Sequence, residues 1–226
     1  MRLWPLLRGA FIARLNRFTA LVELDGTRHE AHIKNSGRLR ELLVPGNTCY
    51  LRLADRPYRR TGFDLVLLQA GGHLACIDTS ISPALVIEAV RAGVIPAFSG
   101  YGVLRTEPGY MGGRFDLLLG GAMRCFVETK CVTLVENGLA LFPDAPTKRG
   151  ARHMERLREA RREGYECAVV FVVQHSGARR FDIHRQMDPE FDQAVADAAK
   201  KGVRFLCCRC HIDTREIRID GMLEFG

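Results

Sequence analysis

Residues 168–173 read Ala-Val-Val-Phe-Val-Val, an unbroken apolar run in which four of the six residues are β-branched valines. Because successive side chains of a strand point to opposite faces, this run predicts a strand that is buried on both faces. Such a strand needs a covering layer on each side of its sheet. Helical patterns at about 147–163 and 188–202 supply that cover, so we predict an α/β domain around this strand.

The rest of the second half fits the same domain. Ser82 and Pro83 predict a helix start, with the serine as cap and the proline at the first position, and Gly93 ends the helix. The further strands of this domain are expected at about 102–107, 115–119, 125–134 and 203–212.

The first 80 residues show a different pattern, with short strands and tight turns. Turn signals at Asp25-Gly26, Pro45-Gly46 and Gly71-Gly72 separate the apolar runs. Five strands are expected at 18–24, 28–33, 48–54, 64–70 and 73–78, with one helical turn at 37–43. This pattern predicts a small barrel of the OB type. The predicted fold class is therefore α+β in two domains, an OB-like β-barrel over residues 1–82 and an α/β domain over residues 83–226.

The charge of the chain favours a polyanionic partner. The formal net charge is +7, and residues 1–85 carry 12 lysine and arginine residues against 7 aspartate and glutamate residues. The abundance of arginine suits phosphate recognition, although the codon bias of a GC-rich genome explains it equally well. No apolar run approaches the ~20 residues that a membrane-spanning helix needs, so no membrane partner is expected.

The cysteines point to a reducing compartment. The chain has eight cysteines, and its first residues are too quickly interrupted by charge to form a secretion signal. We therefore expect free thiols and a cytoplasmic location. Cys207, Cys208, Cys210 and His211 form a cluster, but a zinc site would need a second ligand pair at suitable spacing, and the sequence offers none.

Three charged residues in otherwise apolar strands are the candidates for catalysis. Asp116 lies at the start of one expected strand, and Glu128 and Lys130 lie in the next, two residues apart and so on one face. Two carboxylates suit Mg²⁺ or Mn²⁺, and a lysine beside them can orient a water or contact a phosphate. Thr129 is expected to point away and to offer only its carbonyl, and Glu88 on the preceding helix is a fourth candidate. The alternative is an ordinary solvated ion pair between Glu128 and Lys130.

Several longer strings extend beyond this trio. They are Asn35–Gly46, Phe98–Tyr101, Arg114–Asp116, Glu128–Leu134, Phe142–Ala145 and Thr147–His153. In these segments the chain resembles the sugar fermentation stimulation protein family. The order of a helix, an aspartate and then a Glu-x-Lys motif in successive strands also resembles the PD-(D/E)XK nuclease superfamily. The resemblance implies an OB-like domain, a nuclease-like domain and DNA binding with little sequence preference. It also implies a link to the regulation of sugar, especially maltose, catabolism.

Three positions depart from the usual pattern of these relatives. Phe115 precedes the aspartate where the motif has proline, Thr129 takes a position that is usually aliphatic, and Cys131 stands where serine or asparagine is commoner. None of the three changes a candidate ligand or the lysine.

A set of mostly basic residues in both halves is predicted to contact DNA. Those of the barrel half suit phosphate contacts on the groove of an OB-type fold, and those after Thr147 lie at a helix start, which attracts anions. Phe18 and Tyr58 are candidates for stacking on bases, with core packing as the alternative for Phe18. The predicted DNA-binding residues are Arg17, Asn35, Arg38, Arg59, Arg60, Arg149 and His153.

Two functions follow from these residues. The first is a Mg²⁺-dependent DNA phosphodiesterase, an endonuclease or exonuclease, with Asp116 and Glu128 as metal ligands and with Lys130 and Glu88 assisting. The second is a DNA-binding regulator of sugar catabolism that keeps a nuclease scaffold without cutting. A structural or protein-interaction module is a third, weaker reading, and the sequence gives no indication of oligomeric state.

Overall fold

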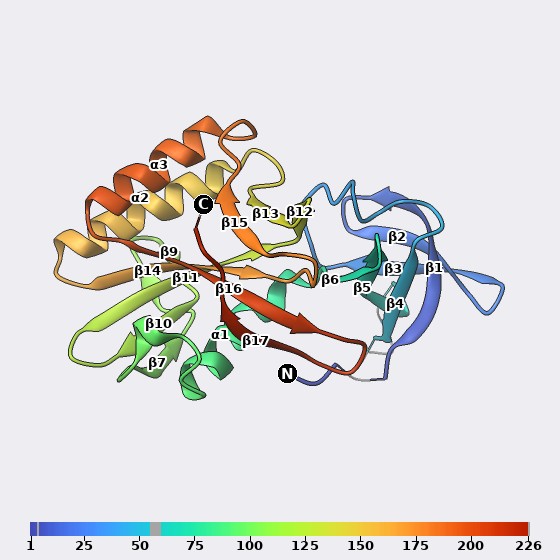
Figure 1. Cartoon of the computed structure of the whole chain (residues 1–226), viewed down its shortest axis with the longest axis horizontal. Coiled ribbons are helices and arrows are strands. Elements are labelled where there is room, and N and C mark those ends of the chain that lie inside the picture. The colour runs from blue at the N-terminus through green and yellow to red at the C-terminus, as the bar shows by residue number, and fades with distance from the viewer. Residues whose placement is uncertain (4, 55–59, 226) are drawn as a thin grey trace.

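The chain folds into a β-barrel followed by an α/β domain (Figure 1). The computed structural model describes residues 1–3, 5–54 and 60–225. The barrel strands are β1 (Leu7–Asn16), β2 (Thr19–Leu24), β3 (Thr27–Ile33), β4 (Thr48–Leu53), β5 (Phe63–Ala70) and β6 (His73–Cys76). Their order is β3-β2-β1-β4-β5-β6, and a parallel pairing of β3 with β5 closes the barrel. The predicted fold class is confirmed.

The longest barrel strand, β1, was absent from the predicted set. Its sequence does not alternate, because irregularities in its pairing with β2 interrupt the register between Phe11 and Ala13 and between Arg14 and Asn16. Only Phe11 of this strand is fully buried. The helical turn expected at 37–43 is reduced to a short turn, in which Leu39 and Leu42 are buried in the barrel core.

The α/β domain is built on a six-stranded mixed sheet of order β17-β16-β14-β11-β10-β7. The strands are β7 (Gly102–Thr106), β10 (Leu117–Gly120), β11 (Arg124–Val132), β14 (Glu166–Val173), β16 (Arg204–Ile212) and β17 (Ile217–Met222). The helices are α1 (Ser82–Arg91), α2 (Lys148–Arg162) and α3 (Pro189–Lys200). Smaller elements are η1 (Thr79–Ile81), η2 (Pro96–Phe98), β8 (Gly109–Tyr110), β9 (Gly113–Arg114), β12 (Leu134–Glu136), β13 (Leu139–Phe142) and β15 (Arg180–Ile183).

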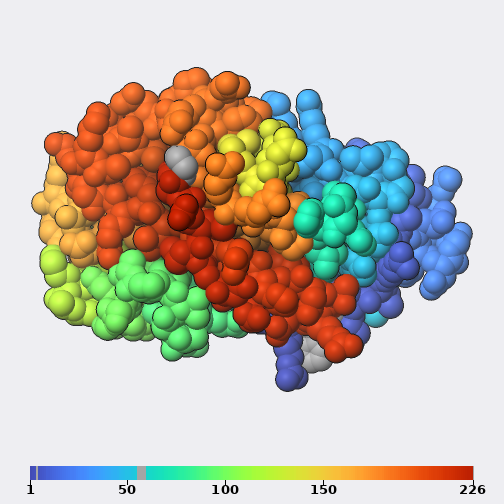
Figure 2. All heavy atoms as spheres, in the orientation of Figure 1, coloured from blue at the N-terminus to red at the C-terminus, as the bar shows by residue number. Residues whose placement is uncertain are grey.

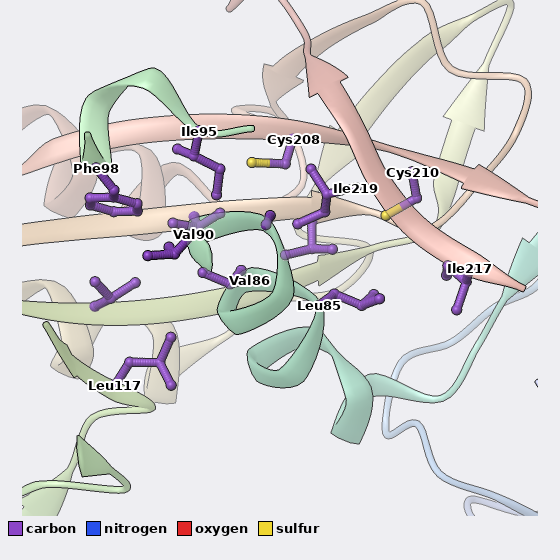
Figure 3. Close-up of a cluster of buried hydrophobic side chains, with 14 of the residues drawn as sticks. Leu85, Val86, Val90, Ile95, Phe98, Leu117, Cys208, Cys210, Ile217 and Ile219 are labelled. Atoms are coloured by element: carbon purple, nitrogen blue, oxygen red, sulfur yellow. The ribbon is translucent and has the colours of Figure 1, made fainter. Parts of the chain in front are cut away.

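The apolar run that predicted a doubly covered strand is β14. Its residues alternate between two cores: Val170 and Val172 face the cluster under α1, whereas Val169 and Phe171 face the cluster under α2 and α3. Figure 3 shows the α1 side, where Leu85, Val86 and Val90 of the helix meet cysteines and isoleucines of β16 and β17. No helix in the described part of the chain is long and apolar enough to cross a membrane.

The start of α1 differs from the prediction. Ser82 is the first helical residue and does not cap the helix, because its hydroxyl donates to Gln174 Oε1 at 2.9 Å. Asp78 instead caps the preceding turn by accepting from the Ser80 amide. By contrast, Thr147 caps α2 as predicted, accepting from the Gly150 amide at 3.0 Å.

Backbone hydrogen bonds and the side chain of one buried glutamine connect the two domains. The Cys76 amide of β6 donates to the Gln174 carbonyl, and the fully buried Gln174 side chain donates to the carbonyls of Cys76 and Asp78. In Figure 2 the residues of β6 lie against those that follow β14. The first three residues also leave the barrel: Leu3 belongs to the core under α1.

Candidate active site

The pairing of β10 with β11 places Asp116 beside Thr129. Leu117 pairs with Val127, so Asp116, one residue before β10, lies next to the middle of β11. Asp116 Oδ2 accepts hydrogen bonds from the Thr129 amide and the Thr129 hydroxyl, each at 2.6 Å. The expectation that Thr129 offers only its carbonyl is therefore wrong: its hydroxyl and amide hold the aspartate in place.

Glu128 and Lys130 share a face, as their spacing predicts. Lys130 Nζ lies 2.6 Å from Glu128 Oε1, and His153 Nδ1 contacts the same oxygen. Glu128 and His153 are 4% and 5% exposed. This pairing is buried, unlike the solvated ion pair that was the alternative.

Each carboxylate keeps one oxygen free of hydrogen bonds from the described residues. Glu128 Oε2 is buried without a partner, and Asp116 Oδ1 accepts no hydrogen bond there. A buried carboxylate oxygen without a partner is costly unless a cation or water satisfies it. The two free oxygens are the part of the site that can accept a metal ion.

Burial and the neighbouring charges shift the pKa values of Asp116 and Glu128 in opposite directions. Burial, followed by the nearby charge of Glu128, raises the pKa of Asp116 despite the hydrogen bonds from Thr129. Burial also acts to raise the pKa of Glu128, but Lys130 and His153 together outweigh it, so that the pKa of Glu128 is lowered. Two carboxylates that influence each other in this way favour a bound cation.

The site can hold a hard divalent ion. No group of three or more His, Cys, Asp or Glu side chains in the described residues is arranged to hold a metal by itself. A pair of carboxylates is nevertheless what Mg²⁺ commonly uses, with water and substrate oxygens completing the shell. The donor set of Asp116 and Glu128 therefore fits Mg²⁺ or Mn²⁺ and not a soft metal.

His153 does not face solvent as its predicted DNA-binding role requires. It is buried between Glu128 and Arg149, whose Nε donates to His153 Nε2 at 3.4 Å. With Nε2 as acceptor, Nδ1 carries the proton and donates to Glu128. His153 is thus a support for Glu128, and Arg149 is the member of the pair that reaches the surface of the cleft.

A cleft of about 820 Å³ between the two domains contains the site. The α/β domain contributes Asp116, Glu128 and Lys130, together with Lys148 and Arg149 from the start of α2. The barrel contributes its β1–β2 turn and the loop after β3. The barrel residues are Arg17, Phe18, Asn35, Ser36 and Gly37.

The loop after β3 is held in the cleft by residues that the sequence analysis did not single out. Asp144 Oδ2 accepts from the Arg38 amide at 2.8 Å, and Arg14 donates to the carbonyls of Gly37 and Arg38, each at 2.8 Å. A side chain on Gly37 would collide with Asp144. Asp144 lies in the string Phe142–Ala145, which was recognised without a role for this residue.

Three predicted site residues lie outside the cleft. Glu88 is on the face of α1 opposite its buried residues, and its carboxylate binds the Met1 ammonium at 2.7 Å. Arg38 lines a neighbouring hollow of about 450 Å³ with Arg14 and Arg40. Arg60 is largely exposed and approaches Glu30 at 3.9 Å. Arg59 and Tyr58 lie outside the described residues.

The exclusion of Glu88 from the site is a correction with a simple cause. Residues 85, 86, 89 and 90 of α1 pack on the sheet, so helical periodicity turns Glu88 away from it.

Two family models match the chain. The SfsA N-terminal OB domain matches residues 12–77, and the sugar fermentation stimulation protein RE domain matches residues 80–216. A sugar fermentation stimulation protein homolog from Caldanaerobacter subterraneus subsp. tengcongensis is 35% identical over 97% of this chain and 96% of its own. Another, from Methanothermobacter thermautotrophicus, is 41% identical over 88% of this chain and 84% of its own.

A solved structure has the same fold throughout. Pyrococcus furiosus SfsA, in complex with Ca²⁺, superposes with a TM-score of 0.93 and 28% identity, covering 100% of this chain and 98% of its own.

Proposed function

The chain belongs to the sugar fermentation stimulation protein family, and from that premise we propose that its interdomain cleft binds DNA and hydrolyses a phosphodiester with a divalent metal ion. The observation that carries the proposal is the pair of the half-buried Asp116 and the buried Glu128, each with one oxygen free of hydrogen bonds from the described residues, beside Lys130 in a cleft that Arg17, Lys148 and Arg149 also line. A structural module would not need an unsatisfied carboxylate at that position.

In this proposal Asp116 Oδ1 and Glu128 Oε2 hold the ion, Mg²⁺ or Mn²⁺. When bound, such an ion neutralises phosphate charge and lowers the pKa of a coordinated water. The Ca²⁺ complex of the Pyrococcus furiosus relative supports divalent-ion binding by this fold. Ca²⁺ and Mg²⁺ both prefer oxygen ligands, which agrees with the donor set here.

The residues around the pair have separate tasks. Thr129 fixes Asp116 through Oδ2, and His153 fixes Glu128 through Oε1, so that Asp116 Oδ1 and Glu128 Oε2 are the oxygens that would hold the ion. Lys130 donates to the same Glu128 oxygen, and its remaining two protons are available to a water or to a phosphate oxygen. The chain thus supplies rigid ligands and one cation placed beside the reacting phosphate.

The walls of the cleft suit a phosphate backbone. Arg17 and Asn35 come from the barrel, and Lys148 and Arg149 come from the start of α2, where the helix dipole also attracts anions. Contacts of this kind go to phosphates and carry no base information, so we propose binding with little sequence preference. Arg38 and Arg60 would act beyond the cleft on longer DNA, and Arg59, which lies outside the described residues, stays a predicted DNA contact.

Cleavage assays with single- and double-stranded DNA test the proposal. Wild-type protein with Mg²⁺ or Mn²⁺ is expected to cut, and Glu128→Gln to cut slower by on the order of a thousandfold. Binding of the variant should stay steeply dependent on salt, since phosphate contacts remain. Glu88→Gln, outside the cleft, is the matched control and should cut at the wild-type rate.

Two outcomes contradict the proposal in different ways. Equal cutting by wild type and Glu128→Gln would remove Glu128 from the chemistry. Salt-dependent binding without cutting under any condition would favour a DNA-binding regulator of sugar catabolism that keeps the scaffold.

A further inference from the structure

Phe18 is an aromatic side chain that the fold leaves half exposed at the rim of the cleft. It lies in the turn between β1 and β2 and is 46% exposed. The other strongly exposed phenylalanine of the described residues, Phe225, packs on Phe181 with ring centroids 5.0 Å apart. Among the described residues, Phe18 has no aromatic partner as close as that: the His32 ring centroid lies 6.4 Å away, and the other neighbour of the ring is the Arg17 guanidinium.

The backbone that carries the exposed ring is held by hydrogen bonds. The Phe18 amide donates to Asn16 Oδ1 at 2.9 Å, and the Phe18 carbonyl accepts from the Ile33 amide at 2.9 Å and from His32 Nδ1 at 3.0 Å. Because this backbone is already ordered, stacking of a flat ligand on the ring costs only the rotamer freedom of one side chain.

Phe18 connects the cleft with a second hollow of about 440 Å³ on the barrel side. Phe18, Asn35 and Ser36 line both spaces, and His32 and Lys34 line the hollow alone. Within the described residues, Asn35 Nδ2 and His32 Nε2 have no hydrogen-bond partner. The hollow therefore combines an aromatic face with two polar groups that can bind the edge of a ring.

A positive charge beside the ring suits the phosphate of a nucleotide. The Arg17 guanidinium lies 5.5 Å from the centre of the Phe18 ring and also lines the cleft. An arginine placed there can contact the phosphate of a nucleotide while the base stacks on the phenylalanine.

We propose that the hollow at Phe18 and His32 takes one unpaired base next to the phosphate that enters the cleft. This inference rests on the proposed function and names its substrate class: DNA with a single-stranded or extruded nucleotide at the cleavage position. Bases inside a duplex have both faces covered by their neighbours, so only an unpaired base can present a face to Phe18.

Binding assays with two matched duplexes test the inference. One duplex is fully paired and the other carries one additional unpaired thymidine, and affinities are measured by fluorescence anisotropy in Ca²⁺. Wild-type protein should bind the bulged duplex about tenfold more tightly, the scale of stacking one base on an aromatic side chain. Phe18→Ala should reduce that ratio to about one and leave the affinity for paired DNA within about twofold.

Two further variants separate stacking from other causes. Phe18→Tyr keeps the aromatic face and should keep the preference, whereas the retained affinity of Phe18→Ala for paired DNA shows that its lost preference is not a folding defect. Arg17→Gln removes a phosphate contact and should weaken binding to both duplexes alike, with the ratio unchanged.

The possible failures are distinguishable. Equal affinity of the wild type for the two duplexes, or an unchanged ratio in Phe18→Ala, overturns this inference while the proposed function stands. Absence of binding to any DNA overturns both.

Discussion

The barrel and the α/β domain each hold a pair of neighbouring carboxylates, buried in the barrel and partly buried in the α/β domain, and the two pairs have different partners. In the barrel, Asp64 and Asp78 are 3% and 2% exposed, and among the described residues they face Lys34 and Arg52 at distances of 2.8–3.7 Å. In the described part of the α/β domain, Lys130 pairs with Glu128 and is the cation whose charge also acts on Asp116, and Glu128 Oε2 has no partner there.

The number of cations beside each carboxylate pair indicates a structural role for the barrel pair and a functional role for the pair in the α/β domain. Each carboxylate of the barrel pair faces both a lysine and an arginine, so its charge is compensated within the protein. Two carboxylates with one lysine lack a positive charge, which a divalent ion and a phosphate would supply together. The comparison predicts that equivalent substitutions in the two pairs have different consequences.

The largest expected effect on stability comes from the barrel pair. Asp64→Asn removes one charge from a balanced buried cluster and should lower the free energy of unfolding by about 3–5 kcal/mol. Asp116→Asn, its counterpart in the cleft, should leave the stability of the metal-free protein unchanged or raised, because it removes repulsion from Glu128. Urea unfolding of both variants in EDTA measures the contrast, and an equal loss of stability would contradict it.

The second prediction concerns the junction between the two domains. Burial, with the nearby His73, lowers the pKa of His175 to about 4, and the two rings lie 5.9 Å apart. Between this pKa and the ordinary histidine value, His175 is therefore protonated in the unfolded chain and neutral in the folded chain. Stability should be fully present above the ordinary histidine pKa of about 6.5 and fall by up to about 3 kcal/mol as pH drops towards 4.

The measurement for this junction is urea unfolding between pH 7 and 4. His175→Asn should flatten the profile, whereas His211→Asn, at an exposed histidine, should retain its shape. Parallel profiles for the wild type and His175→Asn would show that His175 does not determine this dependence.

The smallest of the three effects concerns the support of Glu128. Replacing His153 by glutamine loosens the ligand without removing it, and such outer contacts typically change metal affinity by about 10–100-fold. Arg152→Gln, one residue earlier on α2, is exposed and should not alter Mn²⁺ affinity. If both variants bind Mn²⁺ like the wild type, His153 has only a packing role.

The sequence predicted the long elements well, and it predicted that Glu128 and Lys130 lie on one face. β11, β14, α2, α3 and β16 follow strong periodic patterns, and the Glu128-x-Lys130 spacing dictates a shared face. Strand β1 was missed because pairing irregularities, not side-chain alternation, define it.

The errors at the site concern orientation. Glu88 and His153 lie on helices, and which side of a helix faces a cleft depends on tertiary packing that the local pattern does not contain. Asp144 was overlooked because its role depends on Gly37 and Arg38, more than 100 residues away in the chain.

The central claim, that Asp116 and Glu128 share one divalent ion, is tested most directly by calorimetric titration with Mn²⁺. The account predicts one bound ion per chain in the wild type and in Glu88→Gln, and loss of that ion in Asp116→Asn and in Glu128→Gln. Unchanged Mn²⁺ binding in either of the last two variants would contradict it.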